Sequence, residues 1–201
     1  MISTPDFGPT IEPLAPVELA TTCDATEKPG VQLFRGFAMS EFGARDVGIT
    51  RPCDVGKASE HHEGRAVDLG FDVNVPSEKA NAEAMLDWLL QPDQYGNEHA
   101  MWRRAGVMYA IWNGQIFSNS FGVWRPYTGA SPHTDHVHVS FSWPGARGET
   151  SLYDWLRGGK LPPPGPGPGP GLTASTTSWV GPAAFFAAAA IGFFGVRAMR
   201  G

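Results

Sequence analysis

Two short stretches rich in histidine and acidic residues constrain the fold of this chain more than any other feature. The first is SEHHEGRAVD, residues 59–68, and the second is HTDHVH, residues 133–138; together they hold five of the six histidines. Zinc in proteins takes four ligands, mainly from His, Cys, Asp and Glu, and a catalytic site leaves one position to water. The two stretches therefore outline a zinc site, provided that the fold brings them together.

The residues around the histidines indicate how the fold brings them together. Asp68 lies in an apolar run, AVDLGF, and His136 and His138 lie in another, HVHVSF, and both runs are typical of strands. Residues i and i+2 of a strand face the same side, so His136 and His138 should point into one cleft. An isolated His–Asp pair is more often a surface hydrogen bond, but the clustering of nearly all the histidines favours metal binding.

The motif residues also carry a family resemblance. SEHHEGRAVD matches, at each fixed position, the SxHxxGxAxD signature of zinc D-Ala-D-Ala carboxypeptidases and L-alanyl-D-glutamate endopeptidases. These enzymes belong to a superfamily that includes lysostaphin and the hedgehog domain. DHVH, residues 135–138, resembles the superfamily's HxH and [ED]xxH elements. Over residues 20–157 the chain is also similar to an actinobacterial extracellular domain family related to these peptidases.

The resemblance implies roles for five residues of the two motifs. The metal ligands would be His61, Asp68 and His138. His62 is not expected to be a ligand, because only His61 has the motif spacing. Asp135 would be the general base that accepts a proton, and His136 would help to stabilise the oxyanion.

Two further residues are candidates for substrate binding. Arg51 occupies the place of an arginine that contacts substrate or its oxyanion in the related peptidases, and Ser59 opens the SxH motif. Each has a structural alternative. For Arg51 the alternative is a structural salt bridge, and for Ser59 it is a hydroxyl that caps the N–H groups of a turn.

The resemblance also implies a fold and an activity. We expect an α+β domain like those of hedgehog and the DD-peptidases, with a central, mostly antiparallel sheet, helices on one side and a zinc cleft. The expected activity is Zn²⁺-dependent hydrolysis of peptidoglycan stem peptides, of carboxypeptidase or endopeptidase type. The alternative is a non-catalytic, zinc-stabilised module that binds the cell wall. The net charge of −5 and the scattered basic residues give no sign of nucleic-acid binding.

The two cysteines, Cys23 and Cys53, are expected to form a disulfide. Isolated cysteines in cytosolic proteins are usually free thiols, but neither cysteine here belongs to a CxxC motif of the metal-binding or redox type. An extracellular domain, which the resemblance implies, favours the oxidised pair.

Composition divides the chain into five parts. We expect a poorly ordered, proline-rich arm over residues 1–19, the zinc peptidase-like domain over 20–160, a Pro/Gly-rich linker over 161–178, a transmembrane helix over 179–196 and a cytoplasmic tail over 197–201. Arg197 and Arg200 follow the apolar span, so the positive-inside rule places the domain outside a membrane that the chain crosses once. A cell-wall sorting signal is an alternative, but LTAST departs from the LPxTG pattern.

Local patterns predict the elements of the domain. Helices are expected over 29–42, from an N-cap at Ser77 to 91, and over 97–106; strands are expected over 46–50, 66–73, 107–112, 115–117 and 136–142. Asn113-Gly114 predicts a type I′ hairpin between two of these strands. Residues 119–134 are expected to form a long loop above the metal.

Overall fold

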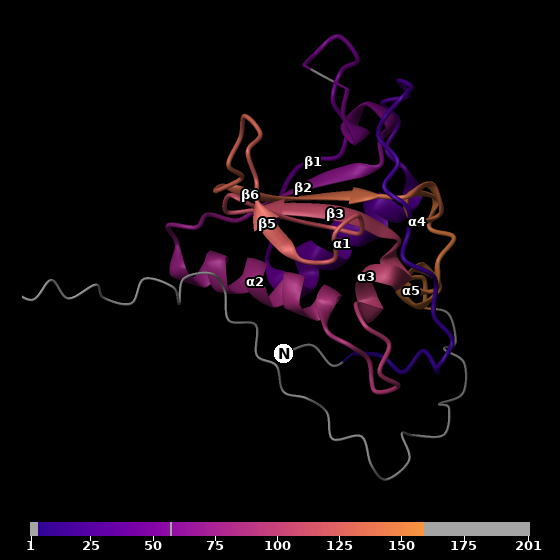
Figure 1. Cartoon of the computed structure of the whole chain (residues 1–201). Helices are drawn as coiled ribbons and strands as arrows, with labels where there is room; N and C mark the ends of the chain where they lie inside the picture. The colour runs from indigo at the N-terminus through magenta and orange to yellow at the C-terminus, as the bar shows by residue number, and fades with distance from the viewer. Residues whose placement is uncertain (1–3, 57, 159–201) are drawn as a thin grey trace, which may run out of the picture.

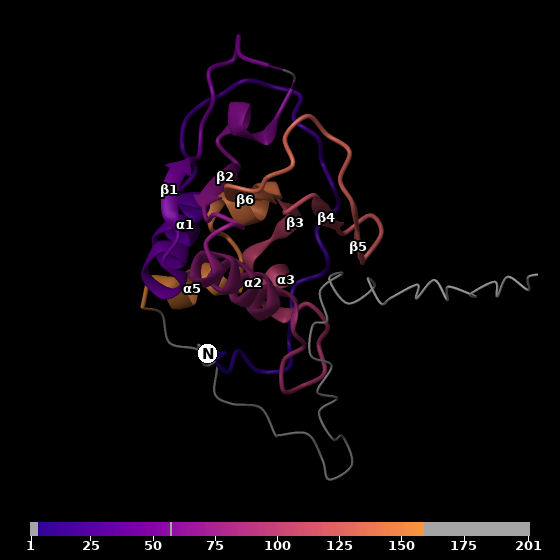
Figure 2. The ribbon, with the colours of Figure 1, turned by 90° about the vertical axis from the view of Figure 1, so that its left-hand side faces the viewer.

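A six-stranded antiparallel sheet holds the two histidine-rich stretches side by side. The structure is a computed structural model that describes residues 4–56 and 58–158. The strand order is β1-β2-β6-β3-β4-β5, so β2, which contains Asp68, lies directly beside β6, which contains His138 (Figure 2). In this register Asp68 is the direct partner of His138, as expected for two neighbouring strands.

The elements follow one another as an α+β domain. The strands are β1 Arg45–Gly48, β2 Ala66–Gly70, β3 Val107–Trp112, β4 Gln115–Ser118, β5 Trp124–Pro126 and β6 His136–Phe141. The helices are α1 Pro29–Phe42, α2 Pro76–Leu90, α3 Ala100–Ala105, α4 Trp143–Arg147 and α5 Ser151–Leu156, together with a 3-10 helix, η1, at Glu60–Glu63.

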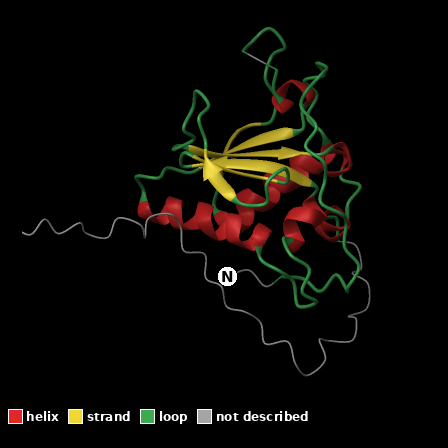
Figure 3. Ribbon diagram, viewed as in Figure 1, coloured by secondary structure: helices red, strands yellow, loops and turns green. Residues whose placement is uncertain are grey.

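The two faces of the sheet differ in polarity because side chains alternate along each strand. Val67 and Leu69 of β2 and Val137 and Val139 of β6 are completely buried on the face that packs against the helices. Phe34 of α1 joins this core, with its ring 5.2 Å from that of Phe141. Figure 3 shows α1, α2, α3 and α5 beneath this face, whereas η1 and two long loops lie on the other side. The side chains of the metal group therefore lie on the face of the sheet opposite the helices.

Most of the expected elements are confirmed, with small shifts at their ends. Helix α1 has the expected bounds and ends at Gly43 in the left-handed conformation. In the hairpin after β3, Asn113 and Gly114 have φ values of 47° and 71°, as a type I′ turn requires. Helix α2 begins at Pro76 with Val75 as the N-cap, so Ser77 lies inside the first turn and the predicted cap was wrong. Proline fits the first helical position because its fixed φ is helical and its missing N–H is not needed there.

Four short elements in the described part of the chain were not expected. The 3-10 helix η1 lies within the first histidine-rich stretch, strand β5 lies within the predicted loop, and α4 and α5 follow β6. All four are too short for their local periodicity to be distinctive. Helix α4 forms because Ser142 caps it, accepting a hydrogen bond from Gly145 N at 3.4 Å, and because Pro144 occupies its first turn.

The N-terminal segment differs from the expected poorly ordered arm. Residues 4–19 contain no helix or strand, yet they lie along the domain (Figure 1). Phe7 is 5% exposed. Carbonyls of the segment accept hydrogen bonds from side chains of the domain, from Arg103 to Glu12, from Asn119 to Ala15 and from Arg65 to Glu18. These partners are about 50 to 100 residues away in sequence, so no local pattern reveals them.

The expected linker 161–178, apolar span 179–196 and tail 197–201 lie outside the described residues. Within residues 4–56 and 58–158, no helix has the length and apolar character needed to cross a membrane.

Cys23 and Cys53 form a disulfide, as expected, with their Cα atoms 5.9 Å apart. The bond joins the segment before α1 to the loop that leads into η1.

Because the disulfide closes a loop with a sequence separation of 30, replacing both cysteines with serine should lower the free energy of unfolding by about 3 to 4 kcal/mol. Urea denaturation measures this difference. Reductant should destabilise the wild type and leave the double variant unchanged; equal stability of the two proteins would contradict the prediction.

A buried ion pair also anchors the N-terminal segment beneath η1. Glu63 accepts hydrogen bonds from Arg65 Nε at 2.5 Å and from the backbone N–H groups of Thr21 and Thr22 at 2.9 Å. Burial alone would raise the pKa of Glu63, but these hydrogen bonds outweigh it and lower the pKa to about 2. The carboxylate therefore stabilises the fold above its ordinary pKa of 4.5, and this contribution is lost as the pH falls towards 2.

Glu63→Gln should accordingly lower the free energy of unfolding at pH 7 by about 3 kcal/mol, because it removes the carboxylate that contacts the buried Arg65 directly and leaves Arg65 with the more distant Glu60, 3.9 Å away. Wild type and variant should converge in stability as the pH is lowered from 5 to 2. Denaturation curves across this range test the prediction. Glu83→Gln is the matched control, since Glu83 is partly exposed and pairs with Lys79 on the surface of α2. A difference in stability between wild type and Glu63→Gln that stays constant at all pH values would refute the prediction.

Candidate metal centre

Three side chains from β2, β6 and η1 bring one potential ligand atom each to a common point. His61 Nε2 lies 3.2 Å from Asp68 Oδ1 and 3.2 Å from His138 Nδ1, and His138 Nδ1 lies 2.9 Å from Asp68 Oδ1. His61 and His138 are buried, and the Asp68 side chain is 13% exposed. The three expected metal ligands thus lie together, and this group can hold a metal ion.

The spacing of the three atoms suits a tetrahedral metal. Two ligand atoms at 2.0 to 2.2 Å from a tetrahedral ion are about 3.3 to 3.6 Å apart. The observed separations are only a few tenths of an ångström shorter. Two imidazole nitrogens and one carboxylate oxygen also form a donor set that Zn²⁺ accepts, with one position left for a further ligand. The residues present therefore fit a zinc ion.

The motif residues between Ser59 and Asp68 give His61 its position. Ser59 is the N-cap of η1, and its hydroxyl accepts a hydrogen bond from His61 N at 3.4 Å. Gly64 ends η1 with φ 64°, and a Cβ there would lie 1.9 Å from Thr26 O. Only glycine fits this close approach. The chain then turns directly into β2, which carries Asp68.

Hydrogen bonds on the outer nitrogens orient both imidazoles. His61 Nδ1 lies 2.7 Å from Ile49 O, a pure acceptor, so Nδ1 carries the hydrogen and Nε2 has the free lone pair. His138 Nε2 lies 2.9 Å from Ser140 Oγ, and its Nδ1 faces Asp68. Such outer partners determine which nitrogen of a histidine can bind a metal.

The electrostatics of the group favour the protonation states that a metal needs. Burial lowers the pKa of His138, which keeps this imidazole neutral. Burial alone would raise the pKa of Asp68, but its close polar contacts with His138 and His61 outweigh burial and hold the pKa well below its ordinary value. A neutral imidazole and an ionised carboxylate are the forms that coordinate metals.

The two expected catalytic residues lie at the edge of the group and contact each other. His136 Nε2 is 3.7 Å from Asp68 Oδ1, so His136 and His138 converge on the same carboxylate. His136 Nδ1 is 2.7 Å from Asp135 Oδ1. The Asp135 side chain is 76% exposed, and its hydrogen bond to His136 lowers its pKa. Asp135 makes no ion pair with His61 or His138, so it reaches the ligand group only through His136.

The two candidate substrate-binding residues flank η1. Arg51 N donates a hydrogen bond to His61 O at 3.2 Å, which places Arg51 beside the ligand. Its half-buried guanidinium forms no ion pair with any residue in the described ranges. Ser59 is half-buried and serves as the cap described above. The structural alternative for Ser59 is thus realised, whereas that for Arg51 finds no partner in the described part of the chain.

The remaining histidines divide into one beside the metal group and two away from it. His133 is 8% exposed, and its ring lies 4.7 Å from that of His136 and 5.8 Å from that of His138. Burial lowers the pKa of His133 to about 4. His62 Nε2 instead faces Val55 O at 2.9 Å, and His99 lies at the start of α3. Sequence reasoning gave His133 no role, and its left-handed φ of 53° is visible only in the structure.

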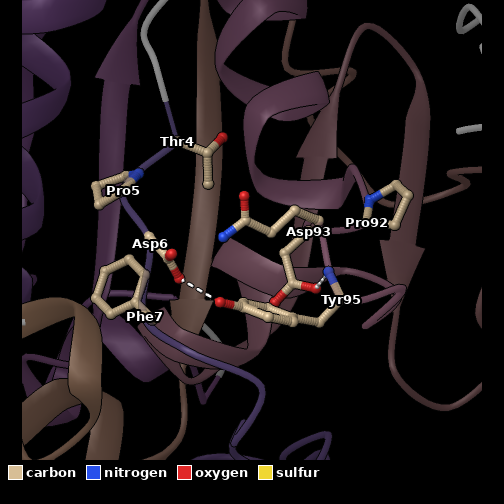
Figure 4. Close-up of a pocket in the computed structure, with 8 residues that line it drawn as sticks. Thr4, Pro5, Asp6, Phe7, Pro92, Asp93 and Tyr95 are labelled. Carbon is tan, nitrogen blue, oxygen red and sulfur yellow. Dashed lines mark hydrogen bonds between the residues drawn. The ribbon is translucent and has the colours of Figure 1, made fainter. Parts of the chain in front are cut away.

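A polar cavity of about 190 Å³ lies elsewhere, between residues 4–7 and the turn that follows α2 (Figure 4). Its carboxylates are already used by the protein. Asp6 accepts a hydrogen bond from Tyr95 Oη at 2.9 Å, and Asp93 accepts one from Tyr95 N at 3.0 Å. None of the residues that line the cavity belongs to the metal group. The hydrogen bonds around it hold the N-terminal segment against the domain and do not extend the site.

Replacing a ligand should abolish metal binding. His61→Ala, Asp68→Ala and His138→Ala should each lose stoichiometric Zn²⁺ after purification and dialysis, because two remaining ligands do not hold zinc tightly. Metal content by mass spectrometry is the measurement. His62→Ala and His99→Ala are matched controls that remove an imidazole outside the group and should retain one Zn²⁺. Full zinc content in His138→Ala would remove this ligand assignment.

Comparison with known proteins identifies one family. Residues 23–138 match the family described as VldE, C-terminal domain. The matched segment begins at Cys23 and ends at His138, so it contains the disulfide and all three members of the metal group. No curated protein and no solved structure matches the chain. Because the match covers more than half of the 201 residues, the chain belongs to the VldE C-terminal domain family.

Proposed function

We propose that the chain is a zinc-dependent peptidase of the DD-peptidase and hedgehog superfamily that hydrolyses peptidoglycan stem peptides. The observation that carries the proposal is the convergence of His61, Asp68 and His138 on one point, with the spacing of a tetrahedral site. The SxHxxGxAxD motif supports the same conclusion. A Zn²⁺ ion bound there supplies a Lewis acid, which polarises a carbonyl and makes water more acidic.

The proton transfers of such a hydrolysis are assigned to His136 together with Asp135. Asp135 accepts a hydrogen bond from His136 Nδ1, which leaves Nε2 as the basic nitrogen, 3.7 Å from Asp68. His136 Nε2 takes a proton from the attacking water as its oxygen bonds to the peptide carbonyl carbon. The same nitrogen returns the proton to the leaving amine as the C–N bond breaks. Asp135 acts through His136, which revises the expectation that Asp135 accepts the proton directly.

Arg51 is assigned to the substrate. The backbone of Arg51 lies beside η1, its guanidinium forms no ion pair in the described ranges, and a stem peptide offers carboxylates that would pair with it. An arginine that forms two parallel hydrogen bonds to a carboxylate also fixes the position of the peptide. This role separates Arg51 from the residues that transfer protons.

A zinc-stabilised, non-catalytic module that binds the cell wall is the second candidate. One observation favours it: the Asp135 side chain is largely exposed and does not contact the ligand group directly. In either case we propose that the domain is extracytoplasmic and that residues 179–196 anchor it in the cell membrane. The Cys23–Cys53 disulfide is consistent with that location.

Digestion of purified peptidoglycan tests the proposal. The full-length chain should release peptide fragments, identified by mass spectrometry, and a chelator should abolish their release. A protein that holds zinc and binds peptidoglycan but releases no fragment would favour the binding module instead.

A double-mutant comparison tests the assignment of the proton transfers. His136→Ala and Asp135→Asn should each lower the rate roughly 10²- to 10⁴-fold while zinc content stays at one ion. If Asp135 acts through His136, the double variant should be no slower than His136→Ala alone. Multiplying effects would instead show that Asp135 acts independently. His99→Ala is the matched control and should retain the wild-type rate.

A further inference from the structure

Three polar side chains, those of Ser140, Tyr109 and Glu60, form a chain behind the ligand His138, on the side away from Asp68. His138 Nε2 lies 2.9 Å from Ser140 Oγ. Ser140 is directly opposite Tyr109 in the pairing of β6 with β3, so the two side chains lie beside each other on the same face of the sheet. Tyr109 Oη in turn donates to Glu60 Oε2 at 2.5 Å. The chain therefore begins at a metal ligand and ends at a carboxylate.

The chemistry of the chain allows one direction for its hydrogens. A carboxylate only accepts hydrogen bonds, so the Tyr109 hydroxyl must donate to Glu60. The Tyr109 oxygen can then accept from Ser140, and the Ser140 oxygen can accept from His138 Nε2–H. With its hydrogen on Nε2, His138 presents the lone pair of Nδ1 to His61 and Asp68. The Glu60 carboxylate thus sets the donor and acceptor role of each group as far as His138.

Packing holds the same residues in place. The Tyr109 ring stacks on the His138 ring with centroids 5.6 Å apart and planes inclined by 26°. Glu60 is 3% exposed and immediately precedes the ligand His61 in η1. Its counter-charge, Arg65 Nη2, lies 3.9 Å away. The chain thus joins η1, β3 and β6, two of which carry ligands.

A purely structural role explains this arrangement poorly. The buried Glu60 carboxylate and the two hydroxyls cost free energy unless each is hydrogen-bonded. Three apolar side chains would fill the same space at a lower cost in free energy. The polar groups also lead to one nitrogen of one ligand. Hydrogen bonds of this kind make a metal-binding imidazole more basic and fix its tautomer.

We propose that Ser140, Tyr109 and Glu60 are positioning residues for metal binding, which hold His138 with Nδ1 free and strengthen its bond to the metal. The proposal rests on the metal centre of the proposed function and not on peptidase activity.

Zinc affinity of the full-length chain, measured by competition with a chromogenic chelator, tests the proposal. Tyr109→Phe keeps the stacked ring but removes the hydroxyl, and should weaken Zn²⁺ binding about 10- to 100-fold. Tyr153→Phe is the matched control, because Tyr153 is fully buried and its hydroxyl donates to Ala105 O at 2.9 Å, outside the chain of side chains behind His138. It also loses one buried hydrogen bond, but should retain wild-type zinc affinity.

The tautomer of His138 gives a second readout, which a general loss of stability would not move. ¹⁵N NMR of the metal-free wild type should show the hydrogen on Nε2. Ser140→Ala should populate the other tautomer and weaken zinc binding, and Glu60→Gln, which keeps the shape but removes the charge, should weaken it less than Ser140→Ala. If Tyr109→Phe does not fold, Ser140→Ala and Glu60→Gln carry the test.

The outcomes separate the two proposals. Equal zinc affinity of wild type and Ser140→Ala, with Nε2–H retained in both, would overturn the positioning role. A wild type that binds no zinc would overturn both the metal centre and this inference. Zinc binding that depends on Tyr109 and Ser140, in a protein that cleaves no peptidoglycan, would support the inference and refute the peptidase.

Discussion

The structure depends on bringing three polar ligand atoms within about 3 Å of one another in a largely buried place. Buried imidazoles and carboxylates are costly unless every donor and acceptor has a partner. The domain meets this requirement around His61 and His138, whose outer nitrogens face Ile49 O and Ser140 Oγ. The three inner atoms face one another and are placed for a cation. Much of the surrounding structure follows from supplying those partners.

Charge is also organised beneath the metal group. Arg65, immediately after the turn that ends η1, is 1% exposed and contacts Glu63, Glu60 and the carbonyls of Glu18 and Phe141. This one guanidinium connects the N-terminal segment, η1 and β6. Replacing Arg65 would leave the buried carboxylates of Glu60 and Glu63 without their cation. The positions of η1 and of the N-terminal segment therefore depend on the same interaction.

The antiparallel sheet explains why the metal group and the residues proposed to act with it lie on one face. In β6 the alternation places Val137, Val139 and Phe141 against the helices and His136, His138 and Ser140 on the opposite side. Loops lie on the side of this second face (Figure 1). One strand therefore supplies a ligand, the residue assigned to proton transfer and a positioning residue at successive alternate positions.

The sequence by itself determined the three members of the metal group, the disulfide, helix α1, the hairpin at Asn113-Gly114 and the pairing of two histidine-rich segments, because each rests on local spacing, on a motif or on the family resemblance. Only the tertiary structure decided the packing of residues 4–19, the contact of Asp135 with His136 and the chain from His138 to Glu60. The alternation of side chains along the strand could have placed Ser140 on the same face as His138, but no local pattern could have placed Tyr109 or Glu60 beside them. These contacts join residues distant in sequence, and their side-chain orientations follow from strand register and burial, which no local pattern encodes.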